Sequence, residues 1–392
     1  MTPRETPAAP PPPGMTASVP RRATRERPRT GWYVAALVVL APLIAETVAS
    51  SNTPAIRFPL VFPVFAVVYG CPALLLRELW TRGRLTGPRL LLWGLGYTAF
   101  NEGVVAGVWF KLSPASGKVL VFTASQAGHA AGVNWAVAIG LVVFHTAYSQ
   151  MIPVTLAQAL AGARGRANDR RPWLGRGGIL LCSVLIGFVL LGSLSAKATL
   201  KTCAGPALTG CSTGRQIAAV MVVLITVALT LLPRPRRGAV DEERLRRPPG
   251  DTLPTPARVQ ATWRVLMGAA FGIAVFVAFF VLPLNDVPAA AIATDLALLA
   301  VVALVAARWC RPGRGDLRGD VLVTLGALLP AMALDLASWR LGQPIAVLIV
   351  ITLYGYLLFG PRRGANAPGP THPSAVPRGG PAGPPPASGG HA

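Results

Sequence analysis

Four carboxylic acids stand out in the sequence because each lies inside a long apolar run. A charged side chain at the centre of a membrane helix costs about 2.5–3.5 kcal/mol on insertion scales. Acids in such positions therefore face the interior of a helix bundle, pair with other polar groups or bind a proton, and they are candidate functional residues. The four are Glu46, Glu102, Asp295 and Asp335.

Glu102 is the acid for which the sequence predicts a titratable neighbour. It lies about 18 Å into the apolar run 90–110, and His145 lies about 18 Å into the run 133–160 from the opposite face of the membrane. Consecutive spans are antiparallel, so the two side chains are expected at matching depths on adjacent helices. We take Glu102 and His145 as the candidate catalytic pair.

Further polar side chains accompany this pair. One precedes Glu102, and the others fall on or beside the helix face that carries His145. Pro153 removes one helical hydrogen bond and leaves the carbonyl of Ser149 without its usual donor. Because lipid cannot satisfy polar groups, a polar stripe that ends at a proline kink is expected to line protein or a water-filled cavity. The supporting polar residues are Asn101, Asn134, Tyr148 and Ser149.

Other charges lie nearer the ends of the apolar runs. Arg77 and Glu78 close the second run, and Glu78 is spaced four residues from Arg82, as in an ion pair on a helix surface. We expect these residues to anchor the helix at the cytoplasmic interface. Glu46 lies in the outer third of the first run, beside a polar turn, where we expect an interfacial position.

Three functions are compatible with these residues. In a hydrolase, Glu102 would be the general base for a water molecule, and His145 would stabilise the oxyanion or donate a proton. In a secondary transporter or proton-coupled permease, the intramembrane groups would carry protons or bind a cation, with Asp295 and Asp335 as outlying ion or proton sites. In a non-catalytic accessory protein, the same groups would be polar glue between helices.

The stretch Leu90–Pro153, with the preceding Arg77-Glu78, resembles a pattern seen in uncharacterised bacterial polytopic membrane proteins. Its motifs are Arg77-Glu78, Glu102-Gly103, Gly132-Val133-Asn134-Trp135 and Phe144-His145. More distantly, the stretch is similar to the CAAX-protease and bacteriocin-processing (CPBP) intramembrane proteases. That resemblance implies a hydrolytic site in which Asn101-Glu102 takes the place of a glutamate pair and His145, followed by Ser149, that of a histidine motif. Ala106 stands where that family has an arginine, and the FxxxH element is absent.

Composition predicts the elements that carry these residues. Hydrophobic residues make up 52% of the 392 residues and charged residues 13%, against about 25% charged residues in soluble domains. These values exclude an ordinary soluble enzyme and a disordered protein, and they predict an all-α polytopic transmembrane helix bundle. Since about 20 apolar residues span a bilayer, about ten spans are expected. They are 32–49, 58–76, 90–110, 133–160, 179–195, 217–232, 265–283, 289–307, 321–338 and 344–359.

Polar segments divide the chain into five parts. We expect a disordered arm rich in arginine and proline over 1–31, and a disordered tail over 361–392. The membrane bundle occupies 32–232, with spans one to six, and 265–360, with spans seven to ten. The segment 233–264 between them is expected to be a cytoplasmic linker.

Lysine and arginine alternate in abundance from one loop to the next. The two termini and every second loop hold 30 of the 37 basic residues, and the remaining loops hold 7. Because basic loops stay in the cytoplasm, we predict that both termini are cytoplasmic and that the protein is in a bacterial plasma membrane. The expected partners are the lipid bilayer and anionic lipid headgroups on the cytoplasmic side.

The remaining features bear on metals, cofactors and partners. Cys203 and Cys211 lie in one outward loop, where they would form either a disulfide or two free thiols. Neither a metal nor a cofactor is expected, because the spacing of His and Cys does not indicate a zinc site and no nucleotide-binding motif is present. The arginine clusters lack interleaved aromatic residues, which argues against nucleic-acid binding. The sequence identifies no protein partner.

Overall fold

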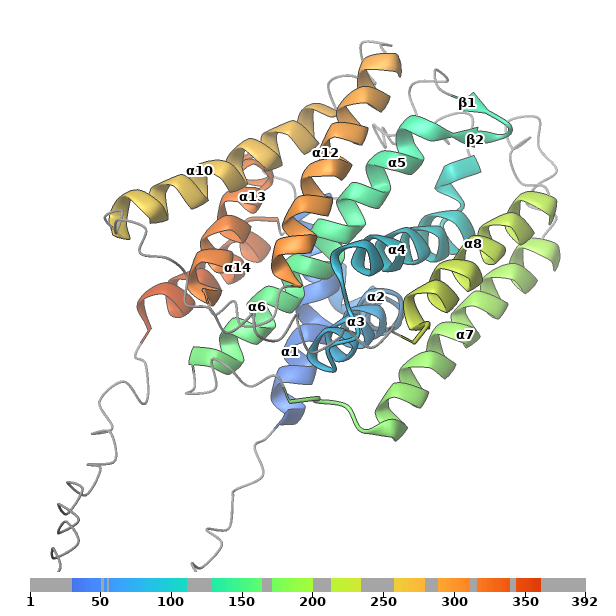
Figure 1. Cartoon of the computed structure of the whole chain (residues 1–392), viewed down its shortest axis with the longest axis horizontal. Helices are drawn as coiled ribbons and strands as arrows, with labels where there is room; N and C mark the ends of the chain where they lie inside the picture. The colour runs from blue at the N-terminus through green and yellow to red at the C-terminus, as the bar shows by residue number, and fades with distance from the viewer. Residues whose placement is uncertain are drawn as a thin grey trace, which may run out of the picture.

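The computed structural model describes residues 30–50, 53–54, 56–110, 129–163, 171–199, 213–233, 257–278, 288–310, 316–338 and 343–360. These residues form a bundle of helices (Figure 1). Within them, the strands are β1 (His129–Ala130) and β2 (Val133–Asn134), a short antiparallel hairpin. The all-α polytopic class predicted from composition is confirmed.

Several helices are continuous but carry two or three labels, because their geometry changes along their length. The first part contains α1 (Thr30–Pro42), η1 (Leu43–Ala49), α2 (Phe58–Phe65), η2 (Ala66–Gly70), α3 (Cys71–Thr81), α4 (Gly87–Thr98), η3 (Ala99–Val105) and η4 (Val108–Phe110). After the hairpin come α5 (Trp135–Phe144), η6 (His145–Met151), α6 (Ile152–Ala161), α7 (Arg176–Thr199) and α8 (Thr213–Leu231). The last part contains α10 (Ala257–Phe276), α12 (Pro288–Trp309), α13 (Leu317–Ser338) and α14 (Gln343–Phe359).

Each of the ten predicted spans overlaps a helix among the described residues. Among the described residues, eight helices are long and apolar enough to cross a membrane. The other two predicted spans are α4 with η3, and α14, which has 17 residues. The eight are Thr30–Ala49, Phe58–Thr81, Trp135–Ala161, Arg176–Ala196, Gly214–Leu231, Val259–Phe276, Ala289–Trp309 and Leu317–Ala337.

The helix boundary that differs most from expectation is the start of α10. This helix begins at Ala257, inside the segment 233–264 that was expected to be a linker. Arg264 of its first turns forms an ion pair with Asp316, which precedes α13, with 2.5 Å between Nη2 and Oδ2. The ion pair gives the polar end of α10 a partner, so the helix extends beyond its apolar stretch.

Four helices change from α-helical to π-helical geometry, near the middle in η2 and η6 and in the last turns in η1 and η3. Proline explains two of the changes, because it has no N–H for the carbonyl four residues before it. Pro72 deprives Val68 in η2, and Pro153 deprives Ser149 in η6. The kink expected at Pro153 therefore takes the form of a π-helical turn. In η3, which has no such proline, the Ala106 amide donates to the Asn101 carbonyl five residues back, at 2.7 Å.

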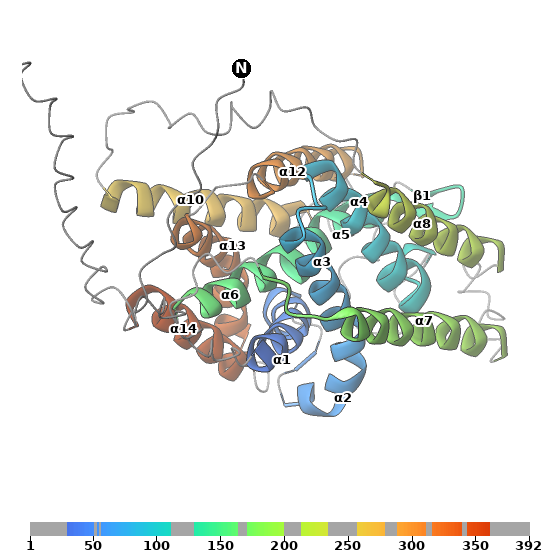
Figure 2. The same cartoon turned by 60° about the horizontal axis from the view of Figure 1, so that its bottom comes forward.

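The helix made of α5, η6 and α6 is the centre of the bundle and is almost wholly buried. Helix α12 packs against α5, helices α1 and α13 pack against α6, and η1 and α4 pack against η6. Helix α7 lies at the edge of the bundle in both views (Figure 2). The central helix therefore meets most of the elements that carry the candidate residues.

Glycines allow α10 and α13 to pack with their backbones in contact. A Cβ atom at Gly268 would collide with the Val323 carbonyl, and one at Gly326 would collide with the Val265 carbonyl. Small residues of this kind are typical of tightly packed membrane helices. Helix α13 is tied in turn to the central helix, since the Tyr148 hydroxyl donates a hydrogen bond to the Ala327 carbonyl at 3.0 Å.

Candidate functional site

The site begins with three side chains in the middle of the bundle. His145 Nε2 lies 2.9 Å from Glu102 Oε1, and His145 Nδ1 lies 2.8 Å from the Ser149 hydroxyl. Ser149 is completely buried, His145 is 2% exposed and Glu102 is 9% exposed. The structure thus brings together Glu102 and His145, as their matching depths predict, and adds Ser149 on the other ring nitrogen.

The network continues from Glu102 toward the first span. Asn101 Nδ2 donates to Glu102 Oε1 at 3.2 Å and to the Tyr69 hydroxyl at 3.0 Å. The Tyr69 hydroxyl in turn donates to Glu46 Oε1. Thr53, after the end of the first span, lies 3.5 Å from Glu46 Oε2. Glu46 is therefore joined to the buried network, although an interfacial position was expected for it.

Tyr69 was not among the residues singled out in the sequence, yet it joins the two glutamates. Its ring lies between those of Phe65 and Tyr97, with centroids 5.6 Å and 6.1 Å away. Tyr97 also meets the His145 ring edge-on, at 5.3 Å. A tyrosine in an apolar run gives little signal, because its ring packs like any other aromatic side chain. Pro72, three residues after Tyr69, is a local sign that the helix is irregular here.

The π-helical segments supply every member of this network within the spans. Glu46 belongs to η1, Tyr69 to η2, Asn101 and Glu102 to η3, and His145 and Ser149 to η6. A π-helical turn changes the direction of its side chains relative to an α-helix, and such turns occur frequently at functional sites. Four π-helical segments meet at this one polar network, which supports its choice as the candidate functional site.

Two of the predicted supporting residues have other partners. Asn134 caps the first turn of α5, where its Oδ1 accepts from the Val137 amide at 3.2 Å. Tyr148 points to α13, as described above, and its ring stacks on Phe144 at 5.1 Å. The structure places both on the central helix and assigns them to capping and packing.

The two late acids are buried in other helices. Asp295 is 3% exposed on α12, which packs against α4 and α5, and its Oδ1 has no hydrogen-bond partner among the described residues. Asp335 is buried on α13, which contacts η1. Both therefore face protein, as expected of intramembrane acids.

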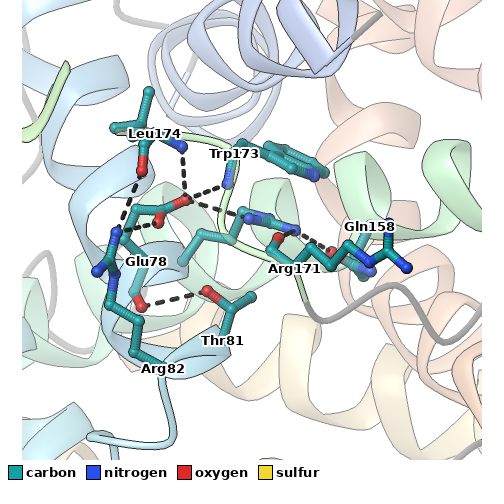
Figure 3. A network of polar contacts seen from close by, with 8 residues as sticks. Glu78, Thr81, Arg82, Gln158, Arg171, Trp173 and Leu174 are labelled. Carbon is teal, nitrogen blue, oxygen red and sulfur yellow. Dashed lines mark hydrogen bonds and ion pairs between the residues drawn. The ribbon is translucent and has the colours of Figure 1, made fainter. Parts of the chain in front are cut away.

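Arg77 and Glu78 form a second polar cluster at the far end of the central helix (Figure 3). Arg77 is completely buried and Glu78 is 2% exposed, so other parts of the protein enclose the pair. Glu78 Oε1 lies 3.2 Å from Arg77 Nη1, and Glu78 Oε2 lies 3.4 Å from Arg82 Nη2. Arg77 Nη2 also donates to Gln158 Oε1 of α6 at 3.2 Å.

The cluster holds the segment that leads into α7. The amides of Trp173 and Leu174 donate to Glu78 Oε1 at 2.8 Å and 3.2 Å (Figure 3). The Trp173 ring lies under the Arg77 guanidinium, 3.4 Å from its Cζ, and stacks on Tyr33 of α1 at 5.6 Å. Trp173 lies far from this pair in the sequence, so its contacts with the pair were not predicted.

The sequence predicts no metal site, and it leaves Cys203 and Cys211 as either a disulfide or two free thiols. Among the residues that the structure describes, no group of three or more His, Cys, Asp or Glu could hold a metal ion. Cys203 and Cys211 lie outside the described residues.

A family model described as "Uncharacterized membrane protein family" matches residues 35–377. Neither the curated proteins nor the solved structures include a match to the chain. The matched description supports a membrane protein and specifies no activity.

Proposed function

The chain belongs to this uncharacterised membrane protein family, and we propose that its bundle carries out proton-coupled transport with Glu102 and His145 as the proton-binding pair. The observation that carries the proposal is the buried chain of hydrogen bonds from Ser149 through His145 and Glu102 to Glu46. Intramembrane carboxylates and histidines are the groups from which proton relays in pumps and transporters are built.

The charge of the Glu102–His145 pair gives a reason for coupling. The pair has no net charge when both groups are ionised or when both are neutral. One proton more or fewer leaves a net charge in a low-dielectric interior, which is costly unless a counter-charge arrives or the helices rearrange. Binding of a proton at this pair is therefore linked to movement of an ion or of a helix.

Proton transport also needs a route to both sides of the membrane. On one side, the hydrogen bonds reach Thr53. On the other, Gln150 Nε2 and Thr146 Oγ1 are buried and have no hydrogen-bond partner among the described residues. Buried polar atoms of this kind are commonly satisfied by water. Their position on η6 supports a hydrated route along the central helix.

The test is proton flux in proteoliposomes that contain a pH-sensitive dye. A rapid external acid step should produce protein-dependent acidification, and Glu102→Gln and His145→Ala should each reduce its rate at least about tenfold, the effect of about 1.4 kcal/mol. Glu243→Gln, in the segment expected to be a linker, is the matched control and should leave the rate unchanged. Equal rates in wild type, Glu102→Gln and His145→Ala would contradict the proposal.

A hydrolase is the second candidate, because the contacts of His145 match those of a catalytic base. A nucleophile hydrogen-bonded to a base that a third group orients is the arrangement found in covalent catalysis. Here those places would be taken by Ser149, His145 and Glu102. The alternative step is activation of water by Glu102, the step expected if the site were similar to that of CPBP proteases. Complete burial of Ser149 favours transport over either hydrolytic route.

Labelling with a fluorophosphonate, which reacts with activated serines, separates serine hydrolysis from transport. Transport predicts that the wild-type protein is not labelled. Labelling that is lost in Ser149→Ala and His145→Ala but kept in Ser193→Ala would establish the hydrolase and overturn the transport proposal.

The surroundings of the protein are part of the proposal. We propose the bacterial plasma membrane, with anionic lipid headgroups at the end of the bundle that carries the Arg77–Glu78 cluster. Arg84, Arg171 and Arg176 are exposed at that end. Basic residues near a membrane surface attract anionic lipids, by about 1 kcal/mol each.

A further inference from the structure

Two cysteines from distant parts of the chain meet inside the bundle. Cys71 is the first residue of α3 and directly follows η2, and Cys182 lies in α7. Both are unoxidised and 6% exposed, and α7 packs against η2 and α3, at whose junction Cys71 lies. The contact joins the peripheral helix α7 to the helix that carries Tyr69.

Cys182 holds a special position on α7. Of residues 176–196, whose side chains the structure describes, Cys182 is the one that is buried. The residues around it, Leu180, Leu181 and Val184, are 65%, 58% and 57% exposed. An exposed apolar face on a spanning helix is a lipid-facing surface. Cys182 therefore lies on the inward side of a helix whose outer face is directed at lipid.

This placement limits which reagents can reach the thiols. A small hydrophilic oxidant has no polar route along the apolar face of α7, whereas a molecule dissolved in the bilayer can approach between its side chains. Buried cysteines in apolar surroundings are normally inert toward aqueous reagents. Two thiols on helices that already pack against each other, however, can be joined without bringing distant segments together.

We propose that Cys71 and Cys182 are a redox pair that is oxidised to a disulfide by a lipid-soluble quinone. Both S–H bonds break and one S–S bond forms. The two electrons and two protons pass to the quinone, which becomes a hydroquinone. The reaction balances without metal or water. The proposal does not depend on whether the protein transports protons.

The disulfide would fasten α7 at a place that matters for the site. Cys71 is two residues from Tyr69, which donates to Glu46, and α7 also packs against η3, which carries Glu102. In the thiol form, α7 is held at this level by apolar packing. In the disulfide form, it is covalently joined to the η2–α3 junction.

The experiment uses the full chain in lipid nanodiscs and two oxidants. Reduced protein is incubated with a short-chain quinone or with glutathione disulfide, remaining thiols are alkylated, and the Cys71–Cys182 peptide pair is measured by mass spectrometry. We expect the linked pair in most chains after quinone and in few after glutathione disulfide. Cys310→Ser should behave as wild type, and Cys71→Ser should leave Cys182 free for alkylation.

Two results would overturn the proposal. If Cys71 and Cys182 are still separately alkylated after quinone treatment, the pair is not redox-active. If glutathione disulfide joins them as fast as quinone does, oxidation does not proceed from the lipid side. The alkylation yield of Cys310 in the same samples shows that the quinone treatment has not consumed thiols indiscriminately.

Discussion

Single side chains in the site each serve two partners. Asn101 donates to Tyr69 and to Glu102, and His145 uses both of its ring nitrogens. A buried polar group that loses its partner costs about 1–3 kcal/mol. Removing one side chain of this network therefore affects the groups on both sides of it, and the effect should reach beyond the position that is changed.

Tyr69→Phe tests whether the two glutamates act together. The substitution removes the hydroxyl between Asn101 and Glu46 and keeps the ring that packs against Phe65 and Tyr97. We expect proton flux to fall about tenfold, which corresponds to about 1.4 kcal/mol. The melting temperature should fall as well, because Asn101 and Glu46 each lose a buried partner. The measurement is the proteoliposome assay, with thermal melting in detergent beside it.

Tyr356→Phe is the matched control, because Tyr356 is 40% exposed on α14. It should retain wild-type flux. A Tyr69→Phe protein that folds and transports protons at the wild-type rate would show that Glu46 is not connected functionally to Glu102.

At the scale of elements, apolar run length is sufficient to predict the helices, because a bilayer requires about 20 apolar residues in each span. Matching depth likewise predicts that Glu102 meets His145. The π-helical segments are not predicted, since they depend on neighbouring helices as well as on prolines. The burial of Arg77 is not predicted either, because it depends on Trp173 and Gln158, which reach it only through the tertiary fold.

Gly326→Leu tests the packing of α10 on α13. Any Cβ at Gly326 would collide with the Val265 carbonyl, which is backbone and cannot rotate away. The two helices would have to separate, and overpacking of this kind costs about 1–3 kcal/mol or more. We expect a lower melting temperature in detergent. The melting is measured by tryptophan fluorescence.

Gly355→Leu provides the comparison for this change. Gly355 lies on α14, and a Cβ there meets no atom within 4 Å. Its melting temperature should stay near that of wild type. Equal melting temperatures for Gly326→Leu and Gly355→Leu would show that close packing of α10 and α13 contributes nothing to stability.

Across the whole molecule, contacts between helix ends agree with an alternating path through the membrane. Trp80 at the end of α3 stacks on Trp309 at the end of α12, with centroids 4.8 Å apart, so these ends lie on one side. Arg215 at the start of α8 lies against Gly132, just before α5, so these starts lie together. The charge asymmetry predicts that the first of these sides is cytoplasmic.

Reporter fusions test this assignment for the full chain. Alkaline phosphatase is active only outside the cytoplasm, so a fusion within 233–264 should be inactive and a fusion within 111–128 should be active. The reason is that 30 of the 37 basic residues lie in the set of segments that includes 233–264, and basic segments resist translocation. A cytoplasmic reporter such as green fluorescent protein should give the opposite pattern at the same two positions. Phosphatase activity at 233–264 would reverse the orientation, and with it the side on which anionic lipids meet Arg84 and Arg176.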